Sequence, residues 1–137
     1  MGEGSGLIRR FYDEVVRDGE LGLIDELTTD DFVDHEEFPE QPPGREGVKF
    51  FVNAMRAAFP DIQAKSIDAT LADGNLEAAH VVLTGTHKGD FIGVAATDKT
   101  VEIESIDIIR LEDGKVAEHW GVTDVMSLMQ QLGAIPE

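Results

Sequence analysis

Residues 107–124 read DIIRLEDGKVAEHWGVTD. The run of short, mostly apolar segments on either side of Glu112-Asp113-Gly114 predicts two strands joined by a tight turn. The stretch also holds two carboxylates, an arginine, a histidine and the only tryptophan of the chain, which are Asp107, Asp124, Arg110, His119 and Trp120. We expect this hairpin to form one wall of any chemical site in the protein.

The length of the turn decides which side chains of the hairpin face each other. In a three-residue loop with Gly114 at positive φ, Leu111 pairs with Lys115. Asp107 then lies opposite His119, where a carboxylate would orient the imidazole and raise its basicity. A two-residue loop shifts the pairing by one, so that His119 turns to the other face of the sheet. We predict the three-residue loop and an Asp107–His119 pair, which acts in proton transfer or only satisfies buried polar groups.

The composition favours a single globular, acidic domain over residues 1–137. Hydrophobic residues make up 42% of the chain, and 28 acidic residues against 11 basic ones give a net charge of −17. This charge repels nucleic acids, and no stretch approaches the roughly 18 apolar residues of a membrane span. The chain has no cysteine and no recognisable export signal. We therefore expect no disulfide, no thiolate site, no membrane or nucleic-acid partner, and a cytoplasmic location.

The order of the predicted elements indicates the class α+β. Apolar residues recur at helical spacing in the first half of the chain and with a period of two from Asp61 onward. The expected helices cover about 7–18, 21–27, 45–58 and 124–132, and the expected strands about 61–72, 76–88, 100–111 and 115–123. Residues 32–35 form a short extended piece before a proline-containing loop. This order predicts a curved antiparallel sheet wrapped on helices, with a cavity at its open end.

Short motifs spread over nearly the whole chain carry a family resemblance. They are Phe32-Val-Asp-His35, Gly44-Arg-Glu-Gly47, Phe59-Pro-Asp61, Gly85-Thr-His87, Gly89-x-Phe91-x-Gly93, Thr97, Ile108-x-Arg110 with Asp113-Gly-Lys115, Glu118-His-Trp120 with Asp124, and Gln130-Gln-Leu-Gly133. The chain resembles the SnoaL-like polyketide cyclases, within the NTF2-like cone-shaped α+β barrels. The resemblance implies a deep, mostly apolar pocket between the helices and the concave sheet, and a homo-oligomer, a dimer or tetramer, that associates through the outer face of the sheet.

The catalytic pair of the resembling cyclases does not carry over to this chain. In the aldol cyclases an acid–base pair acts on a polycyclic aromatic ester. Its histidine lies three residues before the arginine of the motif, and its aspartate three residues before the last aspartate. Those positions are Asp107 and Gly121 here, and a glycine exchanges no protons. The three-residue loop is preferred because it brings both positions to one face, as the family's chemistry needs.

The candidate site residues follow from the hairpin, the helical stripes and the loops. Asp107, His119 and Asp124 are the predicted catalytic residues, although Asp124 also suits the N-cap of the last helix. The predicted ligand-binding side chains, several of which suit the core equally well, are Tyr12, His35, Phe51, Met55, Phe59, His87, Phe91 and Trp120. The four histidines have no metal-ligand spacing, so we predict neither a metal nor another cofactor.

Three functions remain open at this stage. The first is a cofactor-independent cyclase or isomerase that transfers protons on a small apolar or aromatic molecule, with Asp107 as the base or as the partner of His119. The second is a non-catalytic ligand-binding or dimerisation module. The third is an epoxide hydrolase that uses Asp107, Arg110 and Asp124, although residues three apart on one strand face opposite sides. Arg110 is instead expected to form an ion pair with Glu118 or Glu102.

Overall fold

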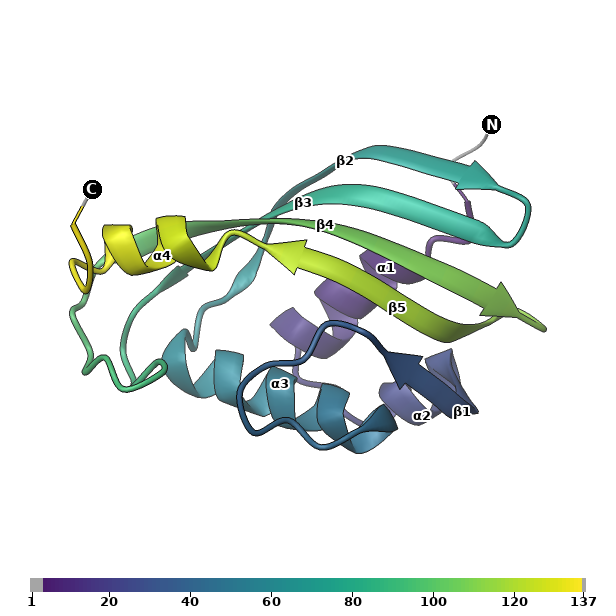
Figure 1. Cartoon of the computed structure of the whole chain (residues 1–137), viewed down its shortest axis with the longest axis horizontal. Coiled ribbons are helices and arrows are strands. Elements are labelled where there is room, and N and C mark those ends of the chain that lie inside the picture. The colour runs from purple at the N-terminus through teal and green to yellow at the C-terminus, as the bar shows by residue number, and fades with distance from the viewer. Residues whose placement is uncertain (1–3, 137) are drawn as a thin grey trace.

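In the computed structural model, which describes residues 4–136, helices cover the concave face of a curved sheet (Figure 1). The predicted domain range of 1–137 includes residues 1–3 and 137, which lie outside the described part. The elements in chain order are α1 Leu7–Arg10, η1 Phe11–Arg17, α2 Leu23–Leu27, β1 Thr28–Asp34, α3 Gly44–Ala58, β2 Gln63–Asp73, β3 Leu76–Thr86, β4 Thr100–Glu112, β5 Lys115–Thr123 and α4 Val125–Gln131. The predicted sequence of helices, strands and a final helix is therefore present.

The sheet has five strands in the order β1-β5-β4-β3-β2. The four predicted strands are antiparallel neighbours, whereas β1 pairs with β5 in parallel. The sequence indicated only a short extended piece at 32–35, but β1 begins at Thr28. Pairing with β5 gives the backbone of this polar segment its hydrogen bonds, which is a contact that local sequence does not reveal.

Alternating burial along the sheet places the core and also the site. Along β4 every second residue is buried, from Val101 to Ile109. The inner faces of β3 and β4 meet the apolar stripe of α3, and these side chains include Val81, Leu83, Val101, Ile103, Val48, Val52 and Met55. Two polar residues, Ser105 and Asp107, interrupt the inner face of β4 and are buried there. The sheet therefore presents a carboxylate to the interior.

The hairpin between β4 and β5 corrects the predicted register. Asp113 and Gly114 both have positive φ, 52° and 79°, which is the geometry of a two-residue type I′ turn. The predicted three-residue loop is therefore wrong, although the positive φ of Gly114 is confirmed. The register then shifts once more, because Ala117 is an extra residue in β5 that has no partner in β4. The two shifts together restore the parity, so that His119 stays on the inner face. The predicted pairing of Asp107 with His119 is nevertheless wrong, because Asp107 lies opposite Gly121 and His119 lies opposite Ile109.

No helix in the stretch from residue 4 to 136 is long and apolar enough to span a membrane. The cytoplasmic location expected from the sequence stays a prediction.

Candidate active site

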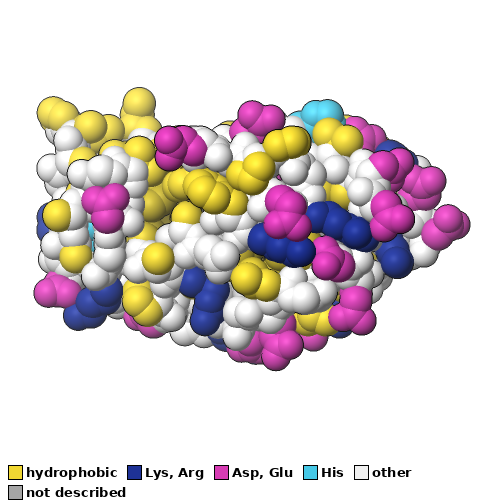
Figure 2. Space-filling view, turned by 90° about the horizontal axis from the view of Figure 1, so that it is seen from below, with side chains coloured by type: hydrophobic (Ala, Val, Ile, Leu, Met, Phe, Trp, Pro, Cys, Tyr) yellow, Lys and Arg dark blue, Asp and Glu magenta, His cyan; other side chains and the backbone are white. Residues whose placement is uncertain are grey.

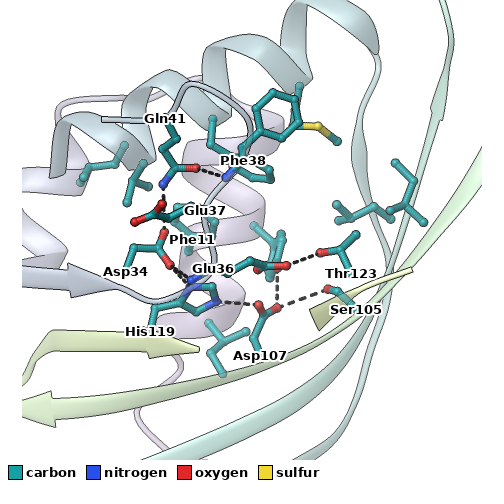
Figure 3. A pocket seen from close by; sticks show the side chains of 18 of the residues that line it. Phe11, Asp34, Glu36, Glu37, Phe38, Gln41, Ser105, Asp107, His119 and Thr123 are labelled. Carbon is teal, nitrogen blue, oxygen red and sulfur yellow. Dashed lines mark hydrogen bonds and ion pairs between the residues drawn. The ribbon is translucent and has the colours of Figure 1, made fainter. Parts of the chain in front are cut away.

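A cavity of about 360 Å³ opens between the helices and the inner face of the sheet (Figure 3). Most of its wall is apolar, and the side chains include Ile8, Phe11, Leu27, Phe51, Met55, Phe91, Ile103 and Ile109. Polar side chains gather at one end of the cavity, and they include Asp34, Glu36, Ser105, Asp107, His119 and Thr123. Figure 2 shows hydrophobic side chains around a hollow on the side where the helices lie. The cavity thus suits an apolar molecule that meets polar groups at one end.

His119 lies between two carboxylates in the polar end of the cavity. Its Nε2 is 2.8 Å from Asp107 Oδ1, and its Nδ1 is 2.8 Å from Asp34 Oδ1. Burial by itself lowers the pKa of this imidazole, but hydrogen bonds and charges from Asp107 and Asp34 outweigh burial and raise the pKa to about 10. His119 is therefore an imidazolium at neutral pH that donates both of its N–H groups. It positions the two carboxylates and is not a free base.

Asp107 accepts hydrogen bonds from three elements of the fold. The hydroxyl of Tyr12, on η1, donates to Asp107 Oδ2 at 2.5 Å, and Ser105 Oγ lies 3.5 Å from the same oxygen. Burial, and then the charge of Asp107, raise the pKa of Tyr12 well above its usual value. Tyr12 therefore remains a neutral donor. The side chain of Asp107 is only 6% exposed. Its hydrogen bonds to Tyr12, Ser105 and His119 hold the carboxylate in one orientation at the cavity wall.

Glu36 enters the polar end of the cavity from the loop after β1. Its Oε2 accepts a hydrogen bond from Thr123 at 2.8 Å, and its backbone N–H donates to Asp34 Oδ1 at 3.0 Å. Burial is the largest influence on the Glu36 carboxyl and raises its pKa above the usual value, against smaller opposing effects of Thr123 and the His119 charge. Asp34 thus ties together the loop that carries Glu36 and the imidazolium of His119.

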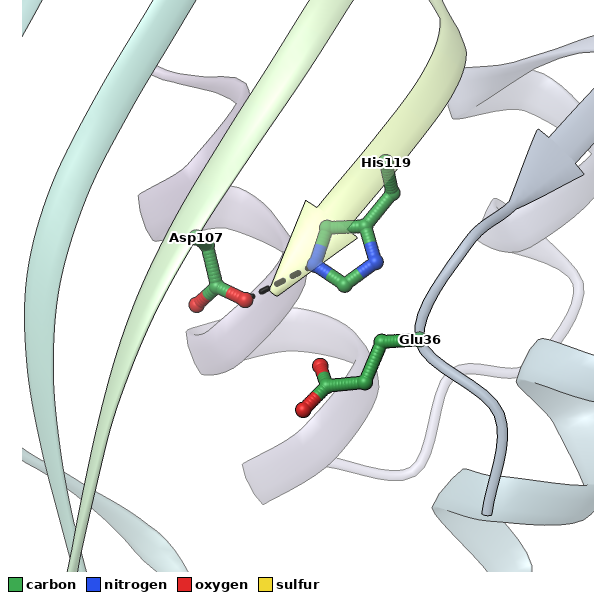
Figure 4. Close-up of side chains that lie close together, drawn as sticks. All are labelled: Glu36, Asp107 and His119. Atoms are coloured by element: carbon green, nitrogen blue, oxygen red, sulfur yellow. Dashed lines mark hydrogen bonds and ion pairs between the residues drawn. The ribbon is translucent and has the colours of Figure 1, made fainter. Parts of the chain in front are cut away.

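Glu36, Asp107 and His119 come close enough to be considered as a metal site (Figure 4). One potential ligand atom from each residue lies within 4.8 Å of the other two. However, the 2.8 Å contact between His119 Nε2 and Asp107 is a hydrogen bond, so the nitrogen that would bind a cation already carries a proton. A metal ion would also have to displace a proton from an imidazole whose pKa is raised to about 10. The geometry suits an arrangement for holding and moving protons better than a metal centre.

The structure brings together only part of the predicted site. Asp107, His119 and Tyr12 meet in the polar end, and the predicted side chains that line the apolar wall are Phe51, Met55 and Phe91. Asp124 is not among the cavity-lining residues, and its side chain accepts a hydrogen bond from Ser127 N at 2.9 Å. Asp124 therefore has the alternative role considered above, the N-cap of α4.

The remaining predicted ligand-binding residues lie outside the cavity lining, and their ligand-binding roles stay predictions. His35 stacks on Trp120 with ring centroids 5.0 Å apart, and its Nε2 bonds Glu118 at 2.8 Å. Trp120 faces outward because residues of even number after the bulge in β5 lie on the outer face. Phe59 and His87 are fully buried and pack together in the core, with ring centroids 5.5 Å apart.

The epoxide hydrolase set is not assembled either. Arg110 binds Glu118 with an Nε–Oε1 distance of 2.6 Å, one of the two expected partners. Arg110 pairs with Glu118 across the strands and follows the buried Ile109, so it lies on the face opposite to Asp107. Asp124 caps α4. The three residues that such a hydrolase would need are therefore apart: Asp107 lies on the inner face of the sheet, Arg110 on the outer face, and Asp124 at the start of α4.

Sequence reasoning missed Asp34, Glu36, Ser105 and Thr123 as members of the polar end. A signal was available for Asp34, because it lies two residues after Phe32 in the predicted extended piece and so shares the face of that apolar side chain. Ser105 shares the face of Asp107 on β4 by the same alternation. The fold of the irregular loop that carries Glu36 depends on distant contacts, which local patterns do not predict.

Comparison with protein families gives a match over most of the chain. The family model described as SnoaL-like polyketide cyclase matches residues 6–132. Nogalonic acid methyl ester cyclase of Streptomyces nogalater is 34% identical over 83 residues, which are 60% of this chain and 61% of that protein. The aklanonic acid methyl ester cyclase DnrD of Streptomyces peucetius is 36% identical over 55 residues, 40% of this chain and 38% of that protein. The matches thus span less than two thirds of either cyclase.

Solved structures share the fold over nearly the whole chain. A proposed polyketide cyclase from Bacillus cereus is 34% identical, with a TM-score of 0.81, and the match covers 94% of this chain and 79% of that one. IdmH, a proposed polyketide cyclase from Streptomyces antibioticus, is 31% identical with a TM-score of 0.80, covering 94% and 97%. TsrD from Streptomyces laurentii, at 23% identity and a TM-score of 0.85, supports the fold alone. The predicted α+β fold class is confirmed.

Proposed function

The chain belongs to the SnoaL-like polyketide cyclase family, and on this basis we propose that it is a cofactor-independent enzyme. It binds a small apolar or aromatic molecule in the cavity and catalyses cyclisation or isomerisation by proton transfer at carbon. The observation that carries the proposal is the hydrogen-bonded group of Asp34, His119, Asp107 and Tyr12 at the polar end of an otherwise apolar cavity.

Asp107 is the proposed base. It takes a proton from a carbon next to a carbonyl group of the bound molecule, and the electron pair of the broken C–H bond forms an enolate. In a cyclisation, the enolate carbon attacks a second carbonyl carbon of the same molecule, so that a C–C bond forms and the π electrons move to oxygen. Tyr12 and His119 hold the carboxylate in place during the step, and the apolar wall excludes water from the enolate.

The proposed substrate class is a neutral ester of an aromatic polyketide. The names of the cyclases that match in part, on nogalonic and aklanonic acid methyl esters, support this class. Charge supports it as well, because Asp34, Glu37 and Asp107 line the cavity and His119 contributes the one imidazolium among the lining residues that the structure describes. A free carboxylate would meet this negative surplus, whereas a methyl ester would not.

The experiment that tests the proposal is conversion of nogalonic acid methyl ester by the Asp107→Asn variant, followed by liquid chromatography and mass spectrometry. We expect turnover to fall on the order of 100- to 10,000-fold, since the amide keeps the shape but accepts no proton. Asp68→Asn is the matched control, because Asp68 lies exposed on β2 outside the cavity. Undiminished turnover by Asp107→Asn would remove Asp107 from the mechanism, and a wild-type protein that binds but converts no ester would favour a non-catalytic binding module.

A second copy of the chain is the proposed protein partner. Ile106, Ile108 and Val122 lie on the outer face of the sheet and are 54%, 39% and 76% exposed. Apolar side chains exposed in this number favour a symmetric interface. Light scattering should therefore give a dimer for the wild-type protein and a monomer for Ile106→Lys. A wild-type monomer at micromolar concentration would contradict this part of the proposal, and it would leave the chemistry of the cavity as it stands.

A further inference from the structure

We propose that Glu36 is the general acid of this site, and that Gly121 provides the space in which its carboxyl group stands. The inference rests on the proposed function and deepens it, because it names the group that protonates the oxygen on which charge develops. Neither residue was among the sequence-predicted catalytic set. Three observations carry the inference, which are the surroundings of Gly121, the anchoring of Glu36 and the nearness of Asp107.

Gly121 has no backbone reason to be a glycine but a clear steric one. It lies inside β5, where a glycine weakens a strand, and its φ is outside the left-handed region. A Cβ atom at this position would lie 2.3 Å from Glu36 Oε1 and 3.0 Å from both Asp107 Oδ1 and His119 Cε1. The missing side chain thus makes room for three polar groups, and the Glu36 carboxyl comes closest of them.

Glu36 is held with one oxygen fixed and the other directed to the shared space. Thr123 donates to Oε2, while Oε1 makes no hydrogen bond with any residue between 4 and 136. The backbone of Glu36 is fixed through Asp34, which also binds His119. A carboxyl group that is anchored at one oxygen and unpaired at the other is suited to donate its proton to a bound molecule. Burial raises the pKa of this carboxyl group above its usual value, which favours the protonated form.

The two carboxyl groups divide the proton transfers between them. Asp107 accepts the proton of the C–H bond, and Glu36 gives its own proton to the carbonyl oxygen that becomes negative as the new bond forms. The product then carries one new O–H bond, Asp107 is protonated and Glu36 is ionised. A proton passes from Asp107 to Glu36 before the next turnover, across a space in which their oxygens lie within 4.8 Å (Figure 4). No oxidant, reductant or added group is needed.

The test removes the carboxyl group from position 36 and supplies one from position 121 instead. Glu36→Gln and Glu36→Ala should both lower conversion of nogalonic acid methyl ester at least 100-fold, and Gly121→Ala should do so as well because its methyl group displaces the flexible Glu36 side chain. The double variant Glu36→Ala with Gly121→Asp should regain at least tenfold over Glu36→Ala, since it supplies a carboxyl group from β5. Glu40→Gln, an exposed glutamate of the same loop, is the matched control with wild-type turnover.

Two readouts separate this inference from the proposed function. If Asp107→Asn abolishes turnover while Glu36→Gln retains it, Glu36 is not the acid and the proposed function stands. If the wild-type protein converts no ester, the proposed function fails. Infrared difference spectra at pH 6 then test whether Glu36 is protonated. A protonated carboxyl band that disappears in Glu36→Gln supports Glu36 as the acid, and a band that stays unchanged in this variant overturns the inference. Circular dichroism of each variant confirms that the fold is retained.

Discussion

The two faces of β5 hold similar sets of side chains in different surroundings. On the inner face His119 meets Asp107 and Asp34, and on the outer face His35 meets Glu118 beside Trp120. The side chain of His119 is 20% exposed and that of His35 is 41% exposed. The inner histidine has two carboxylates and an apolar cavity beside it, and its pKa is raised to about 10. A histidine–carboxylate pair therefore indicates a reactive site only where the fold also withdraws it from water.

Removal of each histidine in turn should give the largest difference in stability between the two faces of β5. His119→Ala leaves the carboxylates of Asp107 and Asp34 buried without their cation, and should lower the free energy of unfolding by about 3–5 kcal/mol. His35→Ala removes an exposed hydrogen bond to Glu118 and should leave stability almost unchanged. Urea unfolding of both variants measures the difference. Equal losses would show that the two faces of β5 are energetically alike.

The pH dependence of stability should separate the same two histidines. The pKa of His119 is raised in the folded protein above its ordinary value of 6.5, so its contribution is fully present below pH 6.5 and is lost as the pH rises toward about 10. The wild-type and His35→Ala proteins should both lose stability over this range. His119→Ala should show a smaller loss. Thermal unfolding between pH 6 and 10.5 measures it, and parallel curves for all three proteins would contradict the assigned charge of His119.

The hydrogen bond from Tyr12 to Asp107 gives a smaller test of the inner face. Tyr12→Phe removes one buried donor to a charged acceptor, which should cost about 2 kcal/mol in the free energy of unfolding. Turnover should also fall, because Asp107 loses one of the groups that orient it. Phe50→Leu, which changes an exposed aromatic residue of α3 outside the cavity lining, is a useful control. A variant as stable and active as the wild type would show that the Tyr12 bond has no role.

The smallest expected effect concerns Asp124, which sequence reasoning placed among the catalytic residues. Asp124→Ala should cost about 1 kcal/mol in the free energy of unfolding, the usual loss for an N-cap. Its turnover should match that of the wild type, since the residue lies outside the cavity lining. Asp124→Ser, which can still cap the helix, should restore most of the stability. A large loss of turnover in Asp124→Ser would return this residue to the catalytic set.

How much the sequence could predict differs between the hairpin and the loop after β1. The strands, their alternation and the inward position of Asp107 follow from a period of two. The sequence also predicted that Asp107 and His119 share one face of the sheet, but the strand register from which this was predicted is wrong. A two-residue turn and a bulge at Ala117 each shift the parity, and their sum depends on packing beyond the hairpin.

The loop after β1 shows the limit of local patterns. Its path is fixed by contacts of Asp34 with His119 and of Gln41 with Asp34 and Phe38, which join residues far apart or in irregular structure. Glu36 could therefore not be placed in the cavity from sequence alone. The sequence did indicate one half of this arrangement, because the glycine at position 121 was already the departure from the resembling cyclases.

The most direct test of Asp107 as the base is solvent deuterium incorporation into carbon of nogalonic acid methyl ester, measured by mass spectrometry. We predict exchange with the wild-type protein and with His35→Ala, and its loss with Asp107→Asn, because only the inner face of β5 reaches the cavity. Exchange that persists in Asp107→Asn, or that disappears in His35→Ala alone, would show that Asp107 is not the base.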